Sequence, residues 1–479
     1  MKSSIQPYKH RIVPVLSFDF AEDLKIIIGK GLILKQADFY SLEENRMEYL
    51  WDQSVQRPSF PALREDTETE VLVIGGGMAG VLCAYRLEQA GVPYLLAEAK
   101  EIGGGVTKGT TAVLTAQHDA LYTDLIAKFG VQKAKQYLDA NLWAVRKFQE
   151  LAKVYPCDFE IEPSFMYTRA DPGKLKQEVR TVNRLGYPAE FQEKTRLPFP
   201  VSGAVCYPDM GQFHPLKFLY GIAKGLNIYE NTFVSRLKGG FAETPNGTIR
   251  AKKIIVATHF PFLNRRGLYP AKLYQMRSFV VALAGAPDLH GTYVDTAQGG
   301  IYFRNYKNLL LVGGGDHRTG SKGGGFPAVH RFVRQYFPRA EEKYVWATQD
   351  CMSLDGIPYI GQYSPATPDL LVTTGFNEWG MTSSMVAAAV LTDRILGNPS
   401  RFADVFSPQR TMLRKQLWVN FGTTIADMAL PVTKRCSHLG CALKWNRAEH
   451  TWDCPCHGSR FDYHGRLIDN PAMRDSKVE

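Results

Sequence analysis

A glycine-rich turn between a short apolar strand and a helix constrains the fold of this chain more than any other feature. Residues 71–74 read Val-Leu-Val-Ile, a fully apolar, β-branched run of the buried parallel-strand type. Residues 75–80 read Gly-Gly-Gly-Met-Ala-Gly and satisfy G-x-G-x-x-G, and a helical pattern of apolar residues follows as far as Ala90. Glycines permit a tight turn and let backbone N–H groups approach a pyrophosphate at the positive end of the helix. The turn therefore predicts a dinucleotide-binding α/β unit with contacts at Gly75, Gly77 and Gly80.

An acidic residue ends the next predicted strand. Residues 94–97 are apolar, and Glu98 follows them 18 residues beyond Gly80. A carboxylate at this place can accept hydrogen bonds from ribose hydroxyls. The motif alone does not separate FAD from NAD, but a second glycine-rich loop at residues 103–107, followed by Thr110 and Thr111, is typical of flavoproteins. These features together favour FAD.

From residue 68 to residue 400 the chain resembles the D-amino-acid-oxidase-like FAD-dependent oxidoreductases of the glycine or sarcosine oxidase type. Residues 231–234 look like the strand whose valine backbone meets adenine in that family. Residues 256–258 are similar to its late A-T-G segment, with His259 in place of the glycine.

The end of this region also resembles the family, because residues 355–361 and 375–382 look like its closing flavin loop and helix. The resemblance implies FAD contacts beyond the first turn and Glu98, at Gly105, Thr107, Thr111, Val234, Gly356, Gly380, Met381 and Thr382. No attachment residue is evident, so we expect FAD to be bound noncovalently, with linkage through His118 as the alternative.

A separate NAD domain would need a second complete glycine motif. The best candidate begins at residues 313–315, but Arg318 stands where the third glycine belongs. We interpret this run as a strand end near the substrate region and expect no NAD site.

The cysteines divide into two groups. Cys83, Cys157, Cys206 and Cys351 are scattered and are expected to be buried small hydrophobic residues, whereas the other four fall within 21 residues. Those four belong to two boxes, Cys-Ser-His-Leu-Gly-Cys at 436–441 and Cys-Pro-Cys-His-Gly-Ser at 454–459. Two thiolates and two imidazoles can hold tetrahedral zinc or a [2Fe–2S] centre. The spacing Cys-x-His in the first box and Cys-x-x-His in the second would supply one thiolate and one imidazole from each box, which favours the iron–sulfur centre.

These boxes resemble those of Rieske proteins of the respiratory cytochrome bc type. The resemblance implies that Cys436, His438, Cys454 and His457 are the cluster ligands and that Cys441 and Cys456 form a disulfide. His450 and His464 lie outside both boxes and are expected to be solvated. Two departures stand out. Phe461 replaces a tyrosine of the family, and residues 417–430 leave room for few of the strands that normally precede the first box.

Composition excludes several classes of protein. Lys and Arg number 57 against 47 Asp and Glu, and the excess is spread thinly, so nucleic-acid binding has no support. No apolar run approaches the ~18 residues of a membrane span, and the first 15 residues lack a signal-peptide core. We expect an intracellular, cytoplasmic protein.

Amphipathic and apolar patterns predict the other elements. Residues 120–154 read as two helices broken at Gly130, and residues 383–396 read as a helix that ends at Gly397. Residues 160–350 contain short apolar strands separated by turn residues, which suits a mostly antiparallel sheet.

The chain is thus predicted to hold an α/β Rossmann-like FAD-binding domain with an α+β antiparallel-sheet substrate domain, plus a small all-β Rieske module. The expected boundaries are an N-terminal extension and linker at 1–66, the oxidoreductase at 67–410 (FAD-binding parts 67–118, 225–261 and 350–400; substrate parts 119–224 and 262–349), and a linker with a short Rieske domain at 411–479.

Flavin accepts two electrons and can release them singly, whereas a Rieske cluster carries one. The combination predicts a dehydrogenase that passes electrons through the cluster to an external acceptor, and the family resemblance implies an amine or amino-acid substrate. Candidates for catalysis or substrate contact are Gln117, His118, Arg304, His317, Trp346 and Trp379. The alternative for a histidine is a hydrogen-bonded structural role, and the alternative for Arg304 is a surface ion pair. Two further hypotheses are an electron-transfer component without its own substrate and a redox sensor that uses Cys441 and Cys456.

Overall fold

The computed structural model describes residues 26–28, 32–34, 47–264 and 266–478. It divides into two units at residue 46. In the first unit, β1 (Ile26–Ile28) pairs with β2 (Leu32–Leu34) in antiparallel register. The rest of the predicted extension at 1–46 lies outside the described residues. No helix among the described residues is both long and apolar enough to cross a membrane.

Residues 47–66 were expected to be a linker, but in the structure they pack against the body of the second unit. Trp51 is fully buried and donates a hydrogen bond of 2.7 Å from Nε1 to the Thr110 carbonyl. Arg57 forms an ion pair with buried Glu230 at 2.8 Å. The stretch includes the short 3-10 helix η1 (Asp52–Ser54) and belongs to the body of the protein.

The predicted dinucleotide-binding unit forms a mixed sheet around β3 (Thr67–Ile74), whose last four residues are buried. This strand runs parallel to β4 (Tyr94–Ala97) on one side and to β14 (Gly247–Val256) on the other. The remaining strands of this sheet are β11 (Ile228–Tyr229), β12 (Arg236–Lys238), β13 (Phe241–Thr244), β20 (Tyr359–Gln362) and β21 (Leu370–Thr374). Helices α2 (Met78–Gln89) and α10 (Gly380–Leu396) pack against each other beside it.

The predicted strand at 231–234 is wrong. The chain leaves β11 at Tyr229 and passes through a turn in which Asn231 has φ 49°, and β12 begins only at Arg236. Thr232 donates its backbone N–H to the Glu98 carbonyl at 2.8 Å. This segment is therefore a loop that packs across the end of β4.

The second large sheet is mostly antiparallel, as predicted, and only the β16–β7 pair is parallel. Its strand order is β19 (Glu341–Met352), β15 (Tyr274–Ala284), β18 (Leu309–Arg318), β17 (Tyr302–Tyr306), β16 (Thr292–Asp295), β7 (Ser164–Thr168), β9 (Gly203–Tyr207) and β8 (Glu190–Gln192). A three-stranded sheet of β5 (Val113–Leu114), β10 (Gly211–Gln212) and β6 (Glu160–Ile161) completes this part.

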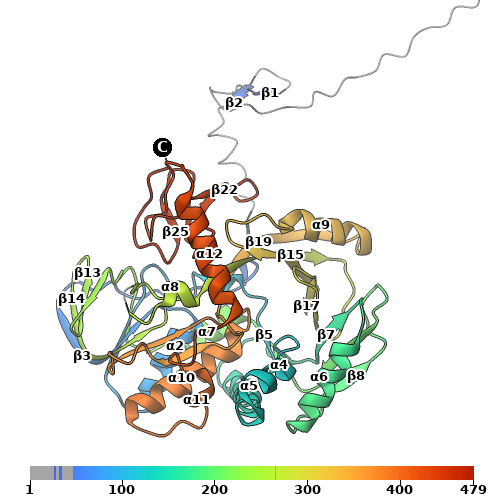
Figure 1. Ribbon diagram of the computed structural model, residues 1–479, viewed down its shortest axis with the longest axis horizontal. Coiled ribbons are helices and arrows are strands. Elements are labelled where there is room, and N and C mark those ends of the chain that lie inside the picture. The colour runs from blue at the N-terminus through green and yellow to red at the C-terminus, as the bar shows by residue number, and fades with distance from the viewer. Residues whose placement is uncertain (1–25, 29–31, 35–46, 265, 479) are drawn as a thin grey trace, which may run out of the picture. The chain divides into compact units, whose positions relative to one another are not determined.

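Helices cover the two large sheets (Figure 1). The predicted break at Gly130 separates α4 (Tyr122–Phe129) from α5 (Val131–Ala152), and Gly130 has φ 84°. The helix predicted at 383–396 begins three residues earlier, at Gly380, and ends at Gly397 as expected. The others are α3 (Val106–Gly109), α6 (Gly173–Arg184), α7 (Pro215–Ala223), α8 (Tyr269–Lys272), α9 (Gly325–Tyr336) and α11 (Ala403–Phe406).

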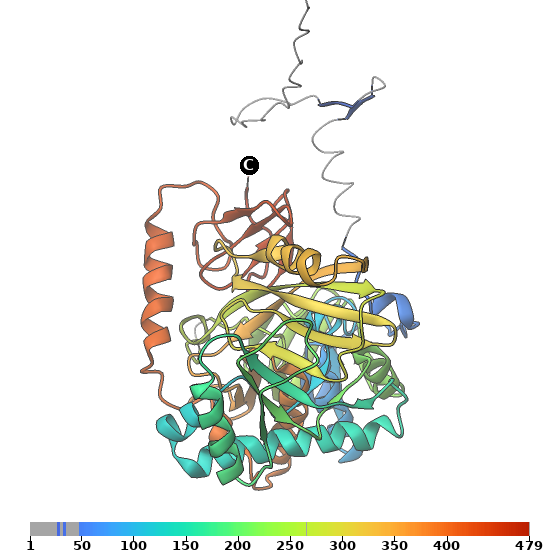
Figure 2. The same ribbon diagram turned by 90° about the vertical axis from the view of Figure 1, so that its right-hand side faces the viewer.

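The C-terminal module is a four-stranded antiparallel sheet of β22 (Lys444–Asn446), β23 (Thr451–Asp453), β24 (Arg460–Phe461) and β25 (Leu467–Asp469). Helix α12 (Lys415–Ala429) occupies the stretch in which few strands were expected, and it runs along the side of the body up to this sheet (Figure 2). Asn420 on α12 accepts a hydrogen bond from Arg318 at 3.1 Å and donates one to the Ala271 carbonyl at 3.2 Å.

Candidate active site and cluster site

The first glycine turn has two kinds of glycine. A Cβ on Gly80 would lie 1.8 Å from the Gly75 carbonyl oxygen, so Gly80 is required for α2 to approach the turn after β3. Gly75 has φ 110°, and a Cβ there would lie 2.5 Å from the Ala257 carbonyl oxygen. A Cβ on Gly77 would meet only Thr107 Oγ1, at 3.4 Å. The fold therefore does not require a glycine at position 77, and the space in front of it is available to a ligand.

Glu98 lies at the end of β4, beside this turn. Its carboxylate accepts hydrogen bonds from the backbone N–H groups of Gly76 at 2.6 Å and Lys100 at 2.8 Å. Burial raises the pKa of Glu98, and these two N–H groups oppose that effect. The carboxylate is thus fixed next to the glycine turn, where the sequence predicts a ribose.

The second glycine-rich loop contacts the first. Thr107 Oγ1 accepts a hydrogen bond of 3.1 Å from the Met78 N–H, and a Cβ on Gly105 would enter open space. Neither Gly77 at the start of α2 nor Trp379 at the start of α10 caps its helix with a side chain. Two helix N-termini without a capping side chain at the N-cap position, together with an open glycine turn, fit a dinucleotide phosphate and a flavin ring.

The later family-like segments lie around the same site. His259, which replaces a glycine, adopts the left-handed conformation at φ 63°, and its carbonyl accepts a hydrogen bond from Thr374. Met381 lies on the wall of the cavity described below, and Gly356 has φ 81°. Val234 is buried in the loop after β11.

A cavity lies between the cofactor loops and the antiparallel sheet. Thr111, Trp379 and Met381 line it from the cofactor side, whereas Tyr302 and Asp350 line it from the sheet. Gln117 also lines it and accepts a hydrogen bond of 3.2 Å from Ser164. This cavity is the candidate substrate site, because both predicted domains contribute to it.

The structure places His118 in the core. Its ring contacts the Tyr137 hydroxyl at 2.7 Å through Nδ1 and the Thr115 carbonyl at 2.9 Å through Nε2, and it stacks on Trp379. Burial lowers the pKa of His118 to about 3. With both nitrogens engaged and the ring neutral, His118 has a structural role in this arrangement.

Arg304 does not form the surface ion pair considered as its alternative, because it is buried. Its guanidinium donates to the carbonyls of Thr111 and Ala112 and lies 5.4 Å from the Trp51 ring. It therefore supports the loop that lines the cavity from behind. Trp346 and His317 also form internal hydrogen bonds, to the carbonyls of Gly109 and Gly315.

The run at residues 313–318, expected to be a strand end, forms the end of β18, which finishes at Arg318. A Cβ on Gly313 would lie 2.0 Å from the Tyr302 ring, so this glycine lets the aromatic side chain lie flat across the neighbouring strand. Tyr302 lines the cavity, which explains this glycine without a nucleotide.

Sequence reasoning missed the acidic side chains at the cavity. Asp350 and Glu378 line it, and Asp316 lies on an adjoining cavity. Burial and the neighbouring Asp316 raise the pKa of Asp350 to about 7, and burial with three nearby carboxylates raises the pKa of Glu378. Glu378 lies within the segment 375–382 that resembles the flavin loop of the family, so the sequence did indicate that this residue is near the cofactor. A single aspartate near the end of a strand gives no such signal.

The two boxes of the C-terminal module form facing loops. In the first box the Cys436 N–H donates to the Cys441 carbonyl and the Cys436 carbonyl accepts from the Gly440 N–H, and in the second box Cys454 makes the same two bonds with Ser459 and Gly458, all at 2.9 Å. The rings of His438 and His457 lie 4.9 Å apart and perpendicular. Cys436 and Cys454 belong to one buried cluster, and a hydrogen bond with the Cys454 thiol lowers the pKa of Cys436 to about 7.

The free atoms of this group fit an iron–sulfur cluster. Nδ1 of His438 and Nδ1 of His457 are buried and have no hydrogen-bond partner among the described residues. Buried polar atoms rarely lack a hydrogen-bond partner, so we expect both nitrogens to bind a ligand. Two adjacent thiols and two imidazole nitrogens from facing loops match the donor set of a Rieske centre.

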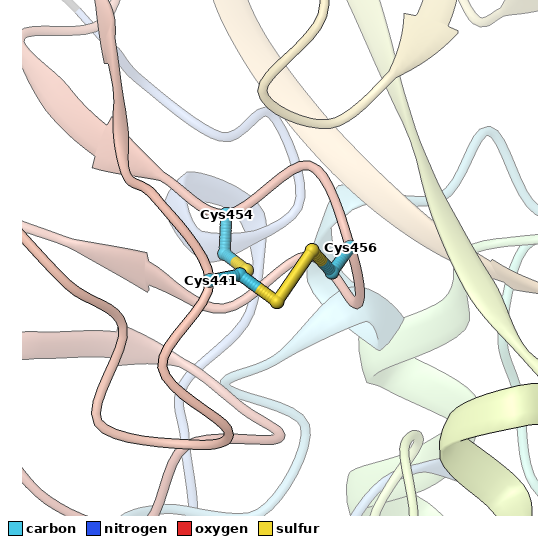
Figure 3. Close-up of side chains that lie close together, drawn as sticks. All are labelled: Cys441, Cys454 and Cys456. Carbon is cyan, nitrogen blue, oxygen red and sulfur yellow. A yellow bond between two sulfur atoms is a disulfide. The ribbon is translucent and has the colours of Figure 1, made fainter. Parts of the chain in front are cut away.

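Cys441 and Cys456 form a disulfide that joins the two loops (Figure 3). The sulfurs of Cys441, Cys454 and Cys456 lie within 4.8 Å of one another. They do not make a three-thiolate metal site, because two of them are bonded to each other. Of these three cysteines, only Cys454 remains available as a ligand, beside Cys436 of the first box. Cys83, Cys157, Cys206 and Cys351 are free and buried, as predicted.

Side chains of the oxidoreductase part surround the cluster loops. Nε2 of His438 lies 2.6 Å from Asn264 Oδ1, and Phe260 packs edge-on against His438 and His457, with ring centroids 6.3 and 6.2 Å apart. Arg318 donates to the carbonyls of Pro455 and Cys456 at 2.7 and 2.8 Å. The loops are therefore docked on the body.

A buried ionic group fixes the rest of the module. Glu449 accepts hydrogen bonds from Arg277 on β15 and from Arg460 on β24, and Arg460 also pairs with Asp453 at 3.1 Å and Asp469 at 3.2 Å. Burial alone would raise the pKa of Glu449, but the charges of Arg277 and Arg460 lower it to about 2. The carboxylate is ionised and connects the module to the substrate sheet.

Comparison with known proteins agrees with this arrangement. Residues 70–394 match the FAD dependent oxidoreductase family (DAO), and residues 405–478 match the Rieske [2Fe-2S] domain. The chain therefore belongs to the FAD dependent oxidoreductase family and carries a C-terminal Rieske domain. Its cofactors are accordingly FAD and a [2Fe–2S] cluster.

Among relatives, the chain is 32% identical over 496 residues to YhfW of Bacillus subtilis (strain 168), which is named as a Rieske 2Fe-2S iron-sulfur protein, and the match covers 90% of this chain and 97% of that protein. A stretch of 39 residues is 51% identical to cytochrome b6-f complex iron-sulfur subunit 1 of Nostoc sp. (strain PCC 7120), covering 8% of this chain and 22% of that subunit.

Solved structures share the fold of the larger part. Glycine oxidase from Geobacillus kaustophilus aligns with a TM-score of 0.60 and 20% identity, covering 72% of this chain and 99% of the oxidase. L-amino acid deaminase from Proteus vulgaris aligns with a TM-score of 0.60 and 14% identity, covering 74% of this chain and 100% of the deaminase.

Proposed function

We propose that the protein is a dehydrogenase that oxidises the C–N bond of an amine or amino acid and passes the electrons by way of its Rieske module to an external acceptor. When bound, FAD accepts two electrons as a hydride and gives them up singly, and the Rieske centre carries one. The substrate would lose a hydride and a proton to become an imine, and two one-electron acceptors would be reduced. Direct use of oxygen would leave the cluster without a role.

One observation carries this proposal: a single short segment contacts both cofactor sites. The Ala257 carbonyl closes over Gly75 of the dinucleotide turn, and three residues later Phe260 packs against both cluster histidines. Asn470 of the module donates to the carbonyls of Thr258 and Phe260. Proximity of this kind favours electron transfer within the chain over two independent sites.

The fold and the cavity support an amine or amino acid as the substrate class. The solved structures with this fold include proteins named glycine oxidase and L-amino acid deaminase. The cavity beside Thr111 and Trp379 is bordered by both parts of the oxidoreductase, which supports a substrate site next to the flavin.

Anaerobic spectroscopy during a screen of amines and amino acids tests the proposal, because flavin and cluster have separate signals. The wild-type protein should show substrate-dependent flavin bleaching followed by cluster reduction. His457→Ala should keep its FAD and the bleaching but lose the Rieske signal, and His464→Ala, an exposed histidine of the same module, should behave as wild type.

Absence of bleaching with every compound in the screen would contradict the proposal and favour an electron-transfer component without its own substrate. Cluster signals that respond to thiol reagents in a protein without turnover would favour a redox sensor. The burial of Cys441 and Cys456 argues against that second outcome.

A further inference from the structure

The candidate substrate cavity is bordered by carboxylates. Asp350 and Glu378 line it, and no Lys, Arg or His is among the described residues of its wall. A second cavity adjoins it and shares Val294, Tyr302 and Glu378. The wall of the second cavity adds four further acidic residues and a single cation, which are Asp119, Asp171, Asp295, Asp316 and Lys174.

These carboxylates lie close enough to interact. Burial raises the pKa of Asp316 to about 6; a hydrogen bond with Ser278 opposes this shift, and the neighbouring Asp119 adds to it. The pKa of Glu378 is also raised, by burial and by the neighbouring carboxylates of Asp316, Asp350 and Asp119. Within the described part of the chain, none of these four carboxylates has an ion-pair partner within 4 Å, unlike Glu449 or Asp355. The group is therefore not explained as an internal ionic network.

Unsatisfied polar atoms on the same wall indicate a missing ligand. Gln117 is 1% exposed and Thr348 is 9% exposed, and both line the first cavity. Among the described residues, Gln117 Nε2 and Thr348 Oγ1 have no hydrogen-bond partner, and neither does Asp316 Oδ1 in the adjoining cavity. Buried groups of this kind are normally satisfied, so a polar molecule is expected to occupy these cavities.

The charge of the wall selects among substrates. The carboxylate of an α-amino acid in the first cavity would face Asp350 and Glu378 with no cation to compensate it. A protonated amine would instead neutralise these side chains. A second ammonium group would do the same for Asp316 and Asp119 in the adjoining cavity.

We infer that the substrate of the proposed oxidation is an aliphatic di- or polyamine without an α-carboxylate, held with one nitrogen beside Asp350 and Glu378 and another beside Asp316. This inference rests on the proposed function and adds the substrate class. The oxidised carbon would lose a hydride to the flavin and its nitrogen would lose a proton to solvent, and the resulting imine would be released.

Binding can be measured apart from turnover. The FAD-loaded protein, reduced photochemically without oxygen, cannot oxidise an amine, so calorimetry then reports binding alone. The probes are putrescine, n-butylamine and ornithine, which differ by one ammonium or one carboxylate. Putrescine should bind more tightly than each of the others by roughly tenfold or more. Ornithine that binds as tightly as putrescine would overturn the inference.

Isosteric variants locate the second ammonium group. Asp316→Asn should weaken putrescine binding by roughly tenfold and leave n-butylamine almost unchanged, whereas Glu378→Gln should weaken both. Asp124→Asn is the matched control, because Asp124 is exposed on α4 and pairs with Lys128 away from the cavity. If Asp316→Asn weakens the binding of both amines equally, the second ammonium group does not lie beside Asp316.

Flavin bleaching by the oxidised protein separates this inference from the proposed function. If amino acids bleach the flavin but putrescine neither binds nor bleaches it, the diamine inference is overturned and the proposed dehydrogenase activity stands. Tight putrescine binding with no bleaching by any compound would overturn the proposed oxidation and leave the cation site standing.

Discussion

The side chain of Gln275 joins His259 of the cofactor turn to His457 of the cluster loop. Its Oε1 lies 3.0 Å from His259 Nε2, and its Nε2 donates to the His457 carbonyl at 2.8 Å. Gln349 adds a parallel connection, because its Nε2 donates to Gln275 Oε1 and to the Gly458 carbonyl, both at 2.9 Å. Two buried amides thus fix the second cluster loop against the oxidoreductase part.

This contact predicts different effects for two similar glycines. Gly440 and Gly458 occupy the corresponding turns of the two boxes, with φ 81° and 83°. A Cβ on Gly458 would lie 2.6 Å from Gln275 Cβ, whereas a Cβ on Gly440 would have nothing within 4 Å. Both alanine variants carry the strain of a left-handed alanine, about 1 kcal/mol.

Only Gly458→Ala should push the loop away from the body. We expect slower electron transfer from flavin to cluster in Gly458→Ala, measured by stopped-flow absorbance, and a near-normal rate in Gly440→Ala. Equal rates in the two variants would mean that the close approach at Gln275 does not control transfer.

The dinucleotide turn offers a similar comparison. Gly77→Val should abolish FAD binding and leave the fold intact, because its side chain would enter the space predicted for the pyrophosphate. Gly80→Ala should impair folding itself, since its Cβ would overlap the Gly75 carbonyl. Flavin absorbance of the purified protein and its thermal unfolding distinguish the two effects. Normal FAD content in Gly77→Val would refute the site.

The ionic group at Glu449 should dominate the acid stability of the module. The pKa of Glu449 is lowered to about 2, below the ordinary carboxylate value. Its ionised carboxylate therefore stabilises the folded protein at neutral pH, and this stabilisation is lost as the pH falls from the ordinary carboxylate pKa toward about 2. Glu449→Gln leaves Arg277 and Arg460 without their shared partner and should destabilise the protein by about 3–5 kcal/mol at pH 7.

Denaturant unfolding measures this change. Glu70→Gln removes an exposed pair with Lys252 and should cost at most about 1 kcal/mol. A variant of Glu449 that unfolds at the wild-type denaturant concentration would show that the buried pair does not stabilise the module.

The cavity carboxylates predict a pH dependence of substrate binding. Asp316 and Asp350 have pKa values raised to about 6 and about 7, so both are partly neutral in mildly acidic solution. Binding of putrescine should strengthen as the pH rises through this range, because the ionised carboxylates attract the cation. Calorimetry in buffers of different ionisation heat should also detect released protons. Binding that is independent of pH would place the cation elsewhere.

Local patterns account for what the sequence predicted well. The glycine turn at 75–80 and the boxes at 436–441 and 454–459 place their functional groups within a few residues, so spacing alone defines the chemistry. Asp316, Asp350 and Glu378 come from β18, β19 and the segment before α10, and only tertiary packing brings them to adjoining cavities. The same is true of the contacts that Gln275 and Arg318 make with the carbonyls of His457 and Pro455, which lie 182 and 137 residues away along the chain.

The resemblance was wrong about the strand at 231–234, where the chain has a turn instead of an extended segment. Asn231 adopts a left-handed conformation, and Thr232 bonds to the end of β4. Conversely, His259 shows that a non-glycine residue can hold a glycine-type backbone when its side chain has a partner, here Gln275.

The last prediction concerns the potential of the cluster. Phe461 is fully buried and belongs to the same apolar group as Cys436, Cys441 and Cys454. Ser459 forms a hydrogen bond with the Cys436 sulfur, so one hydroxyl donor is retained. A donor to a ligand sulfur stabilises the reduced cluster, which carries more negative charge. With phenylalanine at position 461, we expect a potential below that of respiratory Rieske centres and an acceptor less oxidising than cytochrome c.

Phe461→Tyr should add a hydroxyl beside the sulfurs and raise the midpoint potential, whereas Ser459→Ala should lower it by removing the existing donor. Redox titration followed by the cluster signal measures both, and the melting temperature of each variant shows whether the added hydroxyl fits in the buried site. An unchanged or lower midpoint in a well-folded Phe461→Tyr protein would mean that the ring's far edge does not reach a ligand sulfur. The acceptor would then have to be sought without this constraint on its potential.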